Sequence, residues 1–228
     1  MAKRTIVITD IHGCARTFNR LLEILEVRQD DTVYLLGDYI DRGPDSKGVI
    51  DTIRARQSAG FDFLPLLGNH EDLLLQAHRS GVYDDYVDWL DNGGNATLKS
   101  FGVEHLQDLP ETLISFLTRL PLYRMTETHL FVHAGLNSFL ADPLSREGRE
   151  AMLWQRSAVV NQDRICGRVL ISGHTTKSLA EIRESLASEH IQLDNGCVYA
   201  RETTPATRGN LVALILETGK LVVQRNCE

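Results

Sequence analysis

Short apolar runs rich in β-branched residues alternate along the chain with segments of helical periodicity. Near the amino terminus, residues 18–25 place leucine and phenylalanine on one helix face, and residues 113–120 repeat that pattern. The runs 211–216 and 221–224 flank a Gly-containing turn, which predicts an antiparallel hairpin. Buried strands are predicted at residues 5–9, 32–36, 63–67, 129–132 and 168–172. The pattern as a whole predicts an α/β fold with mixed sheets.

One stretch departs from this alternation. From residue 83 the sequence becomes aromatic, acidic and rich in Gly and Asn, and we expect a helical excursion at about residues 83–120, with a loop, over one end of the sheet. Tyr83, Tyr86 and Trp89 have near-helical spacing, which indicates packing; a roof over a substrate cleft is the alternative. No linker, repeat or low-complexity segment interrupts the chain, so residues 1–228 are predicted to form one domain.

Composition and charge narrow the classes of partner. The 228 residues carry 24 Lys and Arg against 31 Asp and Glu, a formal net charge of −7, which argues against bulk nucleic-acid binding. No apolar run reaches the roughly 20 residues of a membrane-spanning helix. The first residues lead straight into a strand without the features of a signal peptide, and the four cysteines form no CxxC pair. We therefore expect a cytoplasmic protein with reduced thiols and no membrane partner.

Metal-competent side chains directly follow all five predicted strands. These are Asp10, His12, Asp38, Asn69, His133 and His174. Ligands bind at the carboxyl ends of strands in α/β sheets, and neighbouring glycines let a ligand approach the backbone closely. Each motif alone is typical of a turn or a packed histidine. Their coincidence after five strands predicts a single site.

The types of ligand indicate which metals would bind. Two carboxylates, one amide oxygen and three imidazoles form a mixed nitrogen and oxygen set, which suits Mn²⁺, Fe or Zn²⁺ in open coordination. Six ligands suffice for two ions that share a carboxylate, the arrangement used for in-line displacement at phosphorus. A hydroxide held between two such ions is a nucleophile at neutral pH. Arg42 adds a planar fork that matches a phosphate.

In their order along the chain, these motifs resemble the signature of the phosphoprotein phosphatase family of metallophosphoesterases. The matching segments are Asp10-x-His12-Gly13, Gly37-Asp38-x-x-Asp41-Arg42-Gly43, Gly68-Asn69-His70-Glu71, His133-Ala134-Gly135 and Gly173-His174-Thr175. The resemblance spans about residues 5–216 and is greatest to the small bacterial and phage serine/threonine phosphatases. It implies a calcineurin-like fold, with a central β-sandwich flanked by helices and a metal site at the carboxyl ends of the strands.

The resemblance also implies a role for each site residue. Asp10, His12 and Asp38 would hold the first of two divalent ions, with Mn²⁺ favoured over Fe or Zn. Asp38 would bridge to a second ion, completed by Asn69, His133 and His174. Phosphoryl oxygens would be bound by Arg42 and Arg156. His70, oriented by Asp41, would protonate the leaving alkoxide.

Three functions remain in competition. The first is a metal-dependent phosphomonoesterase acting on phosphoprotein Ser/Thr or on a phosphorylated small molecule. A symmetrical dinucleoside tetraphosphate hydrolase is the nearest alternative, although the chain is short for that enzyme. A catalytically inactive phosphate-binding module is disfavoured, since every expected ligand and Arg42 are present. Two departures from the family pattern, Thr9 in place of Gly and Asn195 in place of Thr, bear on pocket shape and substrate rather than on metal binding.

Overall fold

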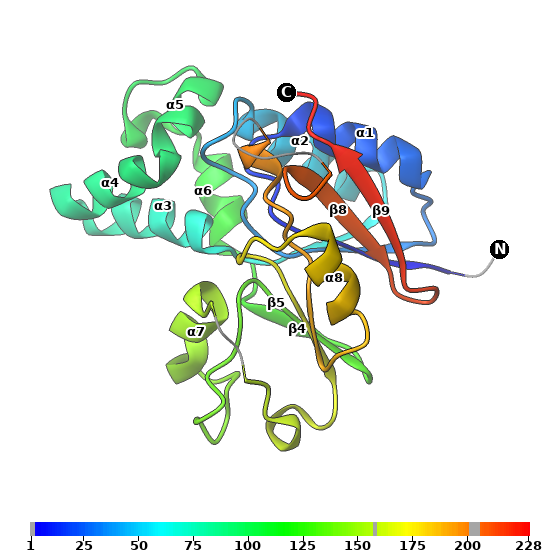
Figure 1. The fold of residues 1–228 in the computed structure, drawn as a ribbon. Coiled ribbons are helices and arrows are strands. Elements are labelled where there is room, and N and C mark those ends of the chain that lie inside the picture. The colour runs from blue at the N-terminus through cyan, green and yellow to red at the C-terminus, as the bar shows by residue number, and fades with distance from the viewer. Residues whose placement is uncertain (1–2, 157–158, 201–205) are drawn as a thin grey trace.

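The computed structural model describes residues 3–156, 159–200 and 206–228, which form two stacked sheets with helices around them (Figure 1). The first sheet has the strand order β3-β2-β1-β8-β9. Its strands are β1 (Thr5–Ile8), β2 (Thr32–Leu35), β3 (Asp62–Pro65), β8 (Asn210–Ile215) and β9 (Lys220–Arg225). β1, β2 and β3 run parallel, whereas β8 is antiparallel to both of its neighbours, β1 and β9. The predicted carboxyl-terminal hairpin is therefore confirmed.

The second sheet has the order β4-β5-β6-β7. Its strands are β4 (Tyr123–Met125), β5 (His129–Val132), β6 (Val169–Ser172) and β7 (His190–Gln192). β5, β6 and β7 are parallel, and β4 is antiparallel to β5. Both sheets are thus mixed, as predicted. Sequence periodicity missed β4 and β7, because three residues are too few to show an alternation.

Side chains that alternate between the two faces of a strand explain how the sheets and helices stack in layers. In β1, Ile6 and Ile8 face a core shared with the first two helices, while Val7 faces a second core that contains Phe131 and Ile171 of the other sheet. Successive side chains of a strand point to opposite faces, so one buried strand serves both cores. A third apolar cluster covers the outer face of the second sheet. The predicted β-sandwich flanked by helices is confirmed.

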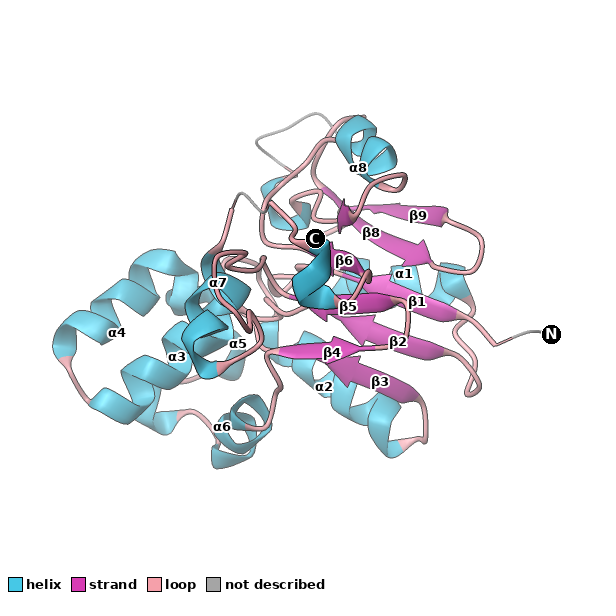
Figure 2. Cartoon of the chain, turned by 90° about the horizontal axis from the view of Figure 1, so that it is seen from below, coloured by secondary structure: helices cyan, strands magenta, loops and turns pink. Residues whose placement is uncertain are grey.

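The helices are α1 (Ala15–Leu25), α2 (Ser46–Ser58), α3 (Asn69–Ser80), α4 (Tyr83–Trp89), α5 (Asn95–Phe101), α6 (Glu111–Thr118), α7 (Arg149–Trp154) and α8 (Leu179–Ser185). Helices α3 to α6 group together on one side of the sheets, away from the amino terminus (Figure 2). Within the excursion, Leu90–Gly94 forms a kink between α4 and α5, where Gly93 has non-helical backbone angles. Among the described residues, no helix is long and apolar enough to span a membrane.

Candidate active site

Strained backbone marks the loops that follow the strands. Among the described residues, seven non-glycine residues have positive φ, and five of them lie in the predicted motifs. These five are His12, Asp38, Asp41, Arg42 and His174. Such conformations cost about 1–3 kcal/mol each and persist where the surrounding structure enforces them, commonly at functional sites. The loops at the carboxyl ends of the strands are therefore held in fixed, unfavourable shapes.

One group of ligand atoms converges around Asp38 and His133. The Nδ1 of His133 lies 2.8 Å from the Leu36 carbonyl, so this nitrogen donates and Nε2 presents a lone pair. That Nε2 lies 2.8 Å from Asn69 Oδ1, 3.2 Å from His174 Nδ1 and 3.5 Å from Asp38 Oδ1. With Asp38 ionised, only the His174 nitrogen among these four atoms can carry a proton to donate. A cation between them would satisfy all four, so the donor set fits a metal ion.

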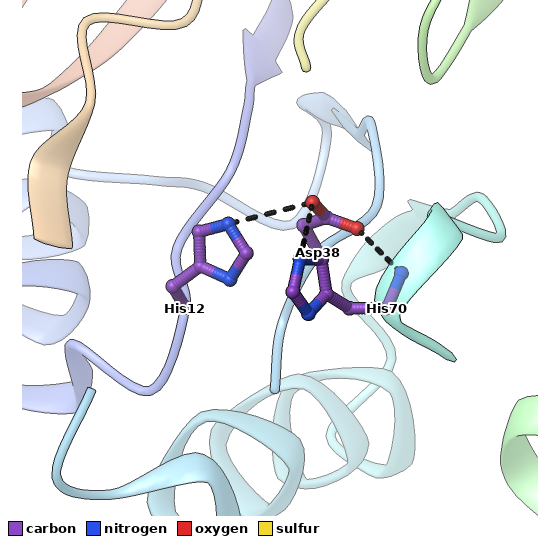
Figure 3. Close-up of side chains that lie close together, drawn as sticks. All are labelled: His12, Asp38 and His70. Carbon is purple, nitrogen blue, oxygen red and sulfur yellow. Dashed lines mark hydrogen bonds and ion pairs between the residues drawn. The ribbon is translucent and has the colours of Figure 1, made fainter. Parts of the chain in front are cut away.

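A second group lies on the other side of Asp38. The Nδ1 of His12 lies 3.0 Å from the Ile40 carbonyl, which leaves Nε2 facing Asp38 Oδ2 at 3.4 Å. His70 approaches the same oxygen with Nε2 at 4.0 Å and donates its backbone N–H to Asp38 Oδ1 at 3.1 Å. Figure 3 shows the two imidazoles beside one carboxylate. Metal-competent atoms of His12, Asp38 and His70 lie within 4.8 Å of one another. Asp38 therefore belongs to two groups of side chains, each close enough together to hold a metal ion.

Asp10 is buried in the same site but belongs to neither group. Both of its oxygens accept the His174 backbone N–H, each at 3.1 Å. The Thr9 hydroxyl also hydrogen bonds to the Asp10 carboxylate. Thr9, one of the two departures from the family pattern, thus supports a predicted ligand directly.

Glu71 shapes the Asp38 loop, and sequence reasoning assigned it no role. Its buried carboxylate accepts backbone N–H groups from Asp38 at 2.9 Å, Tyr39 at 2.7 Å and Gly68 at 3.0 Å. Burial raises the pKa of Glu71 to about 7, and the bonds from Tyr39 and Asp38 oppose that rise. The signal was available, since Glu71 is the third residue of α3, where a capping carboxylate belongs.

Most of the predicted site residues line a small polar cavity of about 90 Å³; Asp41 and His133 do not. Its lining includes Asp10, His12, Asp38, Arg42, Asn69, His70, Trp154, Arg156, His174, Thr176, Asp194 and Tyr199. Arg42 places Nη1 2.8 Å from His12 Nε2 and its guanidinium 5.6 Å from the centre of the Tyr199 ring. Arg156 is exposed at the edge of the cavity. His133 lies just beneath this surface, fully buried.

Electrostatics in the site favour a bound cation. Burial raises the pKa of Asp38 well above its usual value, and the nearby charges of Asp10 and Glu71 raise it further. Burial likewise lowers the pKa of His133 to about 4 and that of His174 to about 3. Imidazoles that stay neutral and carboxylates that resist ionisation are both suited to a metal ion, whose charge stabilises the ionised carboxylates.

Asn195, the second departure from the family pattern, points away from the cavity. Its amide Nδ2 donates to the carbonyls of Lys177 at 2.8 Å and Thr207 at 2.9 Å, and its Oδ1 accepts the Asn210 backbone N–H at 3.1 Å. Asn195 is not among the residues that line the cavity. Its side chain ties the loop after His174 to the start of β8.

The α/β fold has two stacked sheets, and two groups of metal-competent side chains follow the ends of its strands. This combination is typical of a metal-dependent phosphoesterase. The chain belongs to the calcineurin-like phosphoesterase family, whose model matches residues 3–178. It is 28% identical to serine/threonine-protein phosphatase 1 of Salmonella typhimurium, over 88% of this chain and 89% of that one. Identity to the symmetrical bis(5'-nucleosyl)-tetraphosphatase of Delftia acidovorans is 36%, over 57% of this chain. The match spans only 43% of the length of that tetraphosphatase.

Solved structures show the same fold. A serine/threonine phosphatase from Saccharomyces cerevisiae superposes with a TM-score of 0.63 at 15% identity, covering 99% of this chain and 81% of that one. A crystal structure described provisionally as a diadenosine tetraphosphatase gives a TM-score of 0.65 at 24% identity, covering 99% of this chain and 95% of that chain. The resemblance to phosphoprotein phosphatases is confirmed, and the protein is a metallophosphoesterase that acts on a phosphorylated substrate.

Proposed function

We propose that the protein is a serine/threonine protein phosphatase. The observation that carries this proposal is the buried contact between His70 Nδ1 and Asp41 Oδ2, at 2.9 Å, beside the ligand groups around Asp38. A serine or threonine alkoxide is a poor leaving group and needs a proton, whereas a nucleotide leaves readily without one. The match to a serine/threonine phosphatase over nearly the full length of both chains supports the same choice.

The proposed metal ligands combine residues of the two groups around Asp38 with Asp10, which lines the same cavity. Asp38 would be shared by two divalent ions, with Asp10 and His12 on one side. The other side would be completed by Asn69, His133 and His174. Mn²⁺ is the ion we favour for this mixed set, with Fe or Zn as alternatives. When bound, the ions lower the pKa of coordinated water and offset the negative charge of the phosphoryl group.

The chain's own residues would supply the rest of the chemistry. Arg42 and Arg156 flank the cavity and would bind the equatorial phosphoryl oxygens, which gain charge as the reaction proceeds. Water attacks phosphorus opposite the leaving group. As the bond between phosphorus and the leaving oxygen breaks, its electron pair goes to that oxygen. The acid would be His70 in its protonated form, which carries a proton on both ring nitrogens: Asp41 accepts the Nδ1–H, and the Nε2 proton moves to the leaving oxygen. The proton released by the attacking water then restores the protonated form of His70.

A symmetrical bis(5'-nucleosyl)-tetraphosphatase is the second candidate, favoured by the 36% identity to such an enzyme over 137 residues. One assay separates the two candidates. With Mn²⁺ present, we expect kcat/KM for phosphoserine and phosphothreonine peptides to exceed that for diadenosine tetraphosphate by about tenfold or more, a difference of at least ~1.4 kcal/mol in transition-state binding. A phosphotyrosine peptide belongs in the same panel. A clear preference for the tetraphosphate or for phosphotyrosine would overturn the proposal.

A further inference from the structure

The turn that carries Asp41 and Arg42 depends on the helical excursion. These two residues have φ of 69° and 67°, so consecutive side chains occupy the left-handed region. The Asp41 N–H donates to Thr97 Oγ1 at 3.0 Å and to Ser46 Oγ at 3.1 Å. The Arg42 N–H donates to the Gly93 carbonyl at 3.2 Å. Residues of the α4–α5 segment therefore hold a strained turn that would not persist alone.

The same segment fixes the Asp41 carboxylate. The Trp89 indole N–H donates to Oδ1 at 3.2 Å and Oδ2 at 3.1 Å, and the Thr97 hydroxyl donates to Oδ1 at 2.6 Å. His70 Nδ1 meets Oδ2 at 2.9 Å. Asp41, Trp89 and Thr97 are 0% exposed and His70 is 1% exposed, so water does not compete for these contacts. The carboxylate has donors from three side chains and cannot rotate without losing them.

Two glycines allow this arrangement. A Cβ on Gly94 would lie 2.5 Å from Cε2 of the Trp89 ring, so the indole packs directly on the backbone. Gly93 has φ of 105°, and a Cβ there would lie 2.8 Å from the Arg42 backbone nitrogen. Asn92-Gly93-Gly94 is therefore a close-packing element under the Asp41 turn, where glycine is required.

We infer that Trp89 and Thr97 are positioning residues for the acid step: they orient the Asp41 carboxylate, which in turn holds His70 with Nε2 directed into the cavity. The inference rests on the proposed role of His70 as the proton donor. Burial raises the pKa of Asp41 to about 7, and the bonds from Thr97 and Trp89 oppose that rise. Both donors therefore also favour the ionised carboxylate, which can accept the His70 Nδ1–H.

Two conservative variants test the inference through the dependence on leaving group. Trp89→Phe removes the indole N–H, and Thr97→Val removes the hydroxyl while keeping the branched shape. We expect each to lower kcat for a phosphothreonine peptide by about tenfold or more. The rate with p-nitrophenyl phosphate, whose leaving group needs no proton, should change less than about threefold. A purely structural role would lower both rates together.

Tyr86→Phe is the matched control. The Tyr86 ring lies 6.2 Å from the Trp89 ring, within the same segment, and its hydroxyl is not one of the donors to Asp41. This variant should leave both rates unchanged. Thermal unfolding of each variant reports whether it folds, and if Trp89→Phe does not, Thr97→Val decides the question.

A double-variant cycle separates this inference from the acid role itself. In a His70→Asn background, adding Trp89→Phe or Thr97→Val should change the peptide rate less than about twofold, because the residue being positioned is gone. If His70→Asn alone lowers the rates with the peptide and with p-nitrophenyl phosphate equally, the acid role is wrong, and the positioning role is wrong with it. If His70→Asn is selective but the Trp89 and Thr97 variants are not, only the positioning role is overturned.

Discussion

Replacing Asp38 with Asn is expected to lower kcat for every phosphate ester by about 10³-fold or more. Asp38 stands between the two ligand groups, with Oδ2 3.4 Å from His12 Nε2 and Oδ1 3.5 Å from His133 Nε2. Asn has nearly the same shape but no charge, so it would not offset the repulsion between two dications. Phosphate release at saturating Mn²⁺, measured with the metal content of the purified variant, checks this prediction.

Asp51→Asn is the control for this substitution. Asp51 lies on α2 and pairs with Lys47, with both side chains about half exposed. Surface pairs of this kind contribute little to stability, so neither activity nor metal content should change. If Asp38→Asn retained more than about a tenth of wild-type activity, the assignment of Asp38 as the shared ligand would be wrong.

The second large effect is expected for His70→Asn. General-acid catalysis contributes about 10²–10⁴-fold, and it matters most when the leaving group is a poor one. We therefore expect kcat for a phosphothreonine peptide to fall by about 10²-fold or more, while kcat for p-nitrophenyl phosphate falls less than about tenfold. A series of phosphate esters with graded leaving groups would show a steeper dependence in the variant than in the wild type.

His78→Asn supplies the comparison on the same helix. His78 is exposed in the last turn of α3, whereas His70 is buried in the first turn of the same helix. That variant should behave as wild type with both substrates. Equal losses on alkyl and aryl esters in His70→Asn would mean that His70 acts on metal binding or packing, and the acid role would have to be abandoned.

Local periodicity was sufficient to predict much of the fold. The runs at 5–9 and 129–132 became β1 and β5 because buried strands need consecutive apolar residues. The loops that follow the strands of both sheets also place metal-competent residues beside one cavity, while their roles as ligands stay a prediction. The run at 63–67 became a strand at Asp62–Pro65, with its last two residues in the loop that leads to Asn69.

Tertiary contacts decided what the pattern left open. The spacing of Trp89 indicated packing, with a roof over a cleft as the alternative, and the side chain is in fact 0% exposed. Its hydrogen bond to Asp41, 48 residues away in the sequence, leaves no local signal. Gly93 and Gly94 are typical of a loop, and Gly93 does have non-helical backbone angles, but close contacts with Arg42 and Trp89 fix both glycines in a kink between two helices. Long-range side-chain pairing of this kind has no periodicity to detect.

Metal content measured alongside phosphate release tests the two-ion site most directly. The protein would be stripped with a chelator and titrated with Mn²⁺, with bound metal per chain and release from a phosphothreonine peptide followed together. We predict no release from the stripped protein, and a rate that rises until two ions are bound per chain. Release that persists after stripping, or full activity with a single bound ion, would contradict the account.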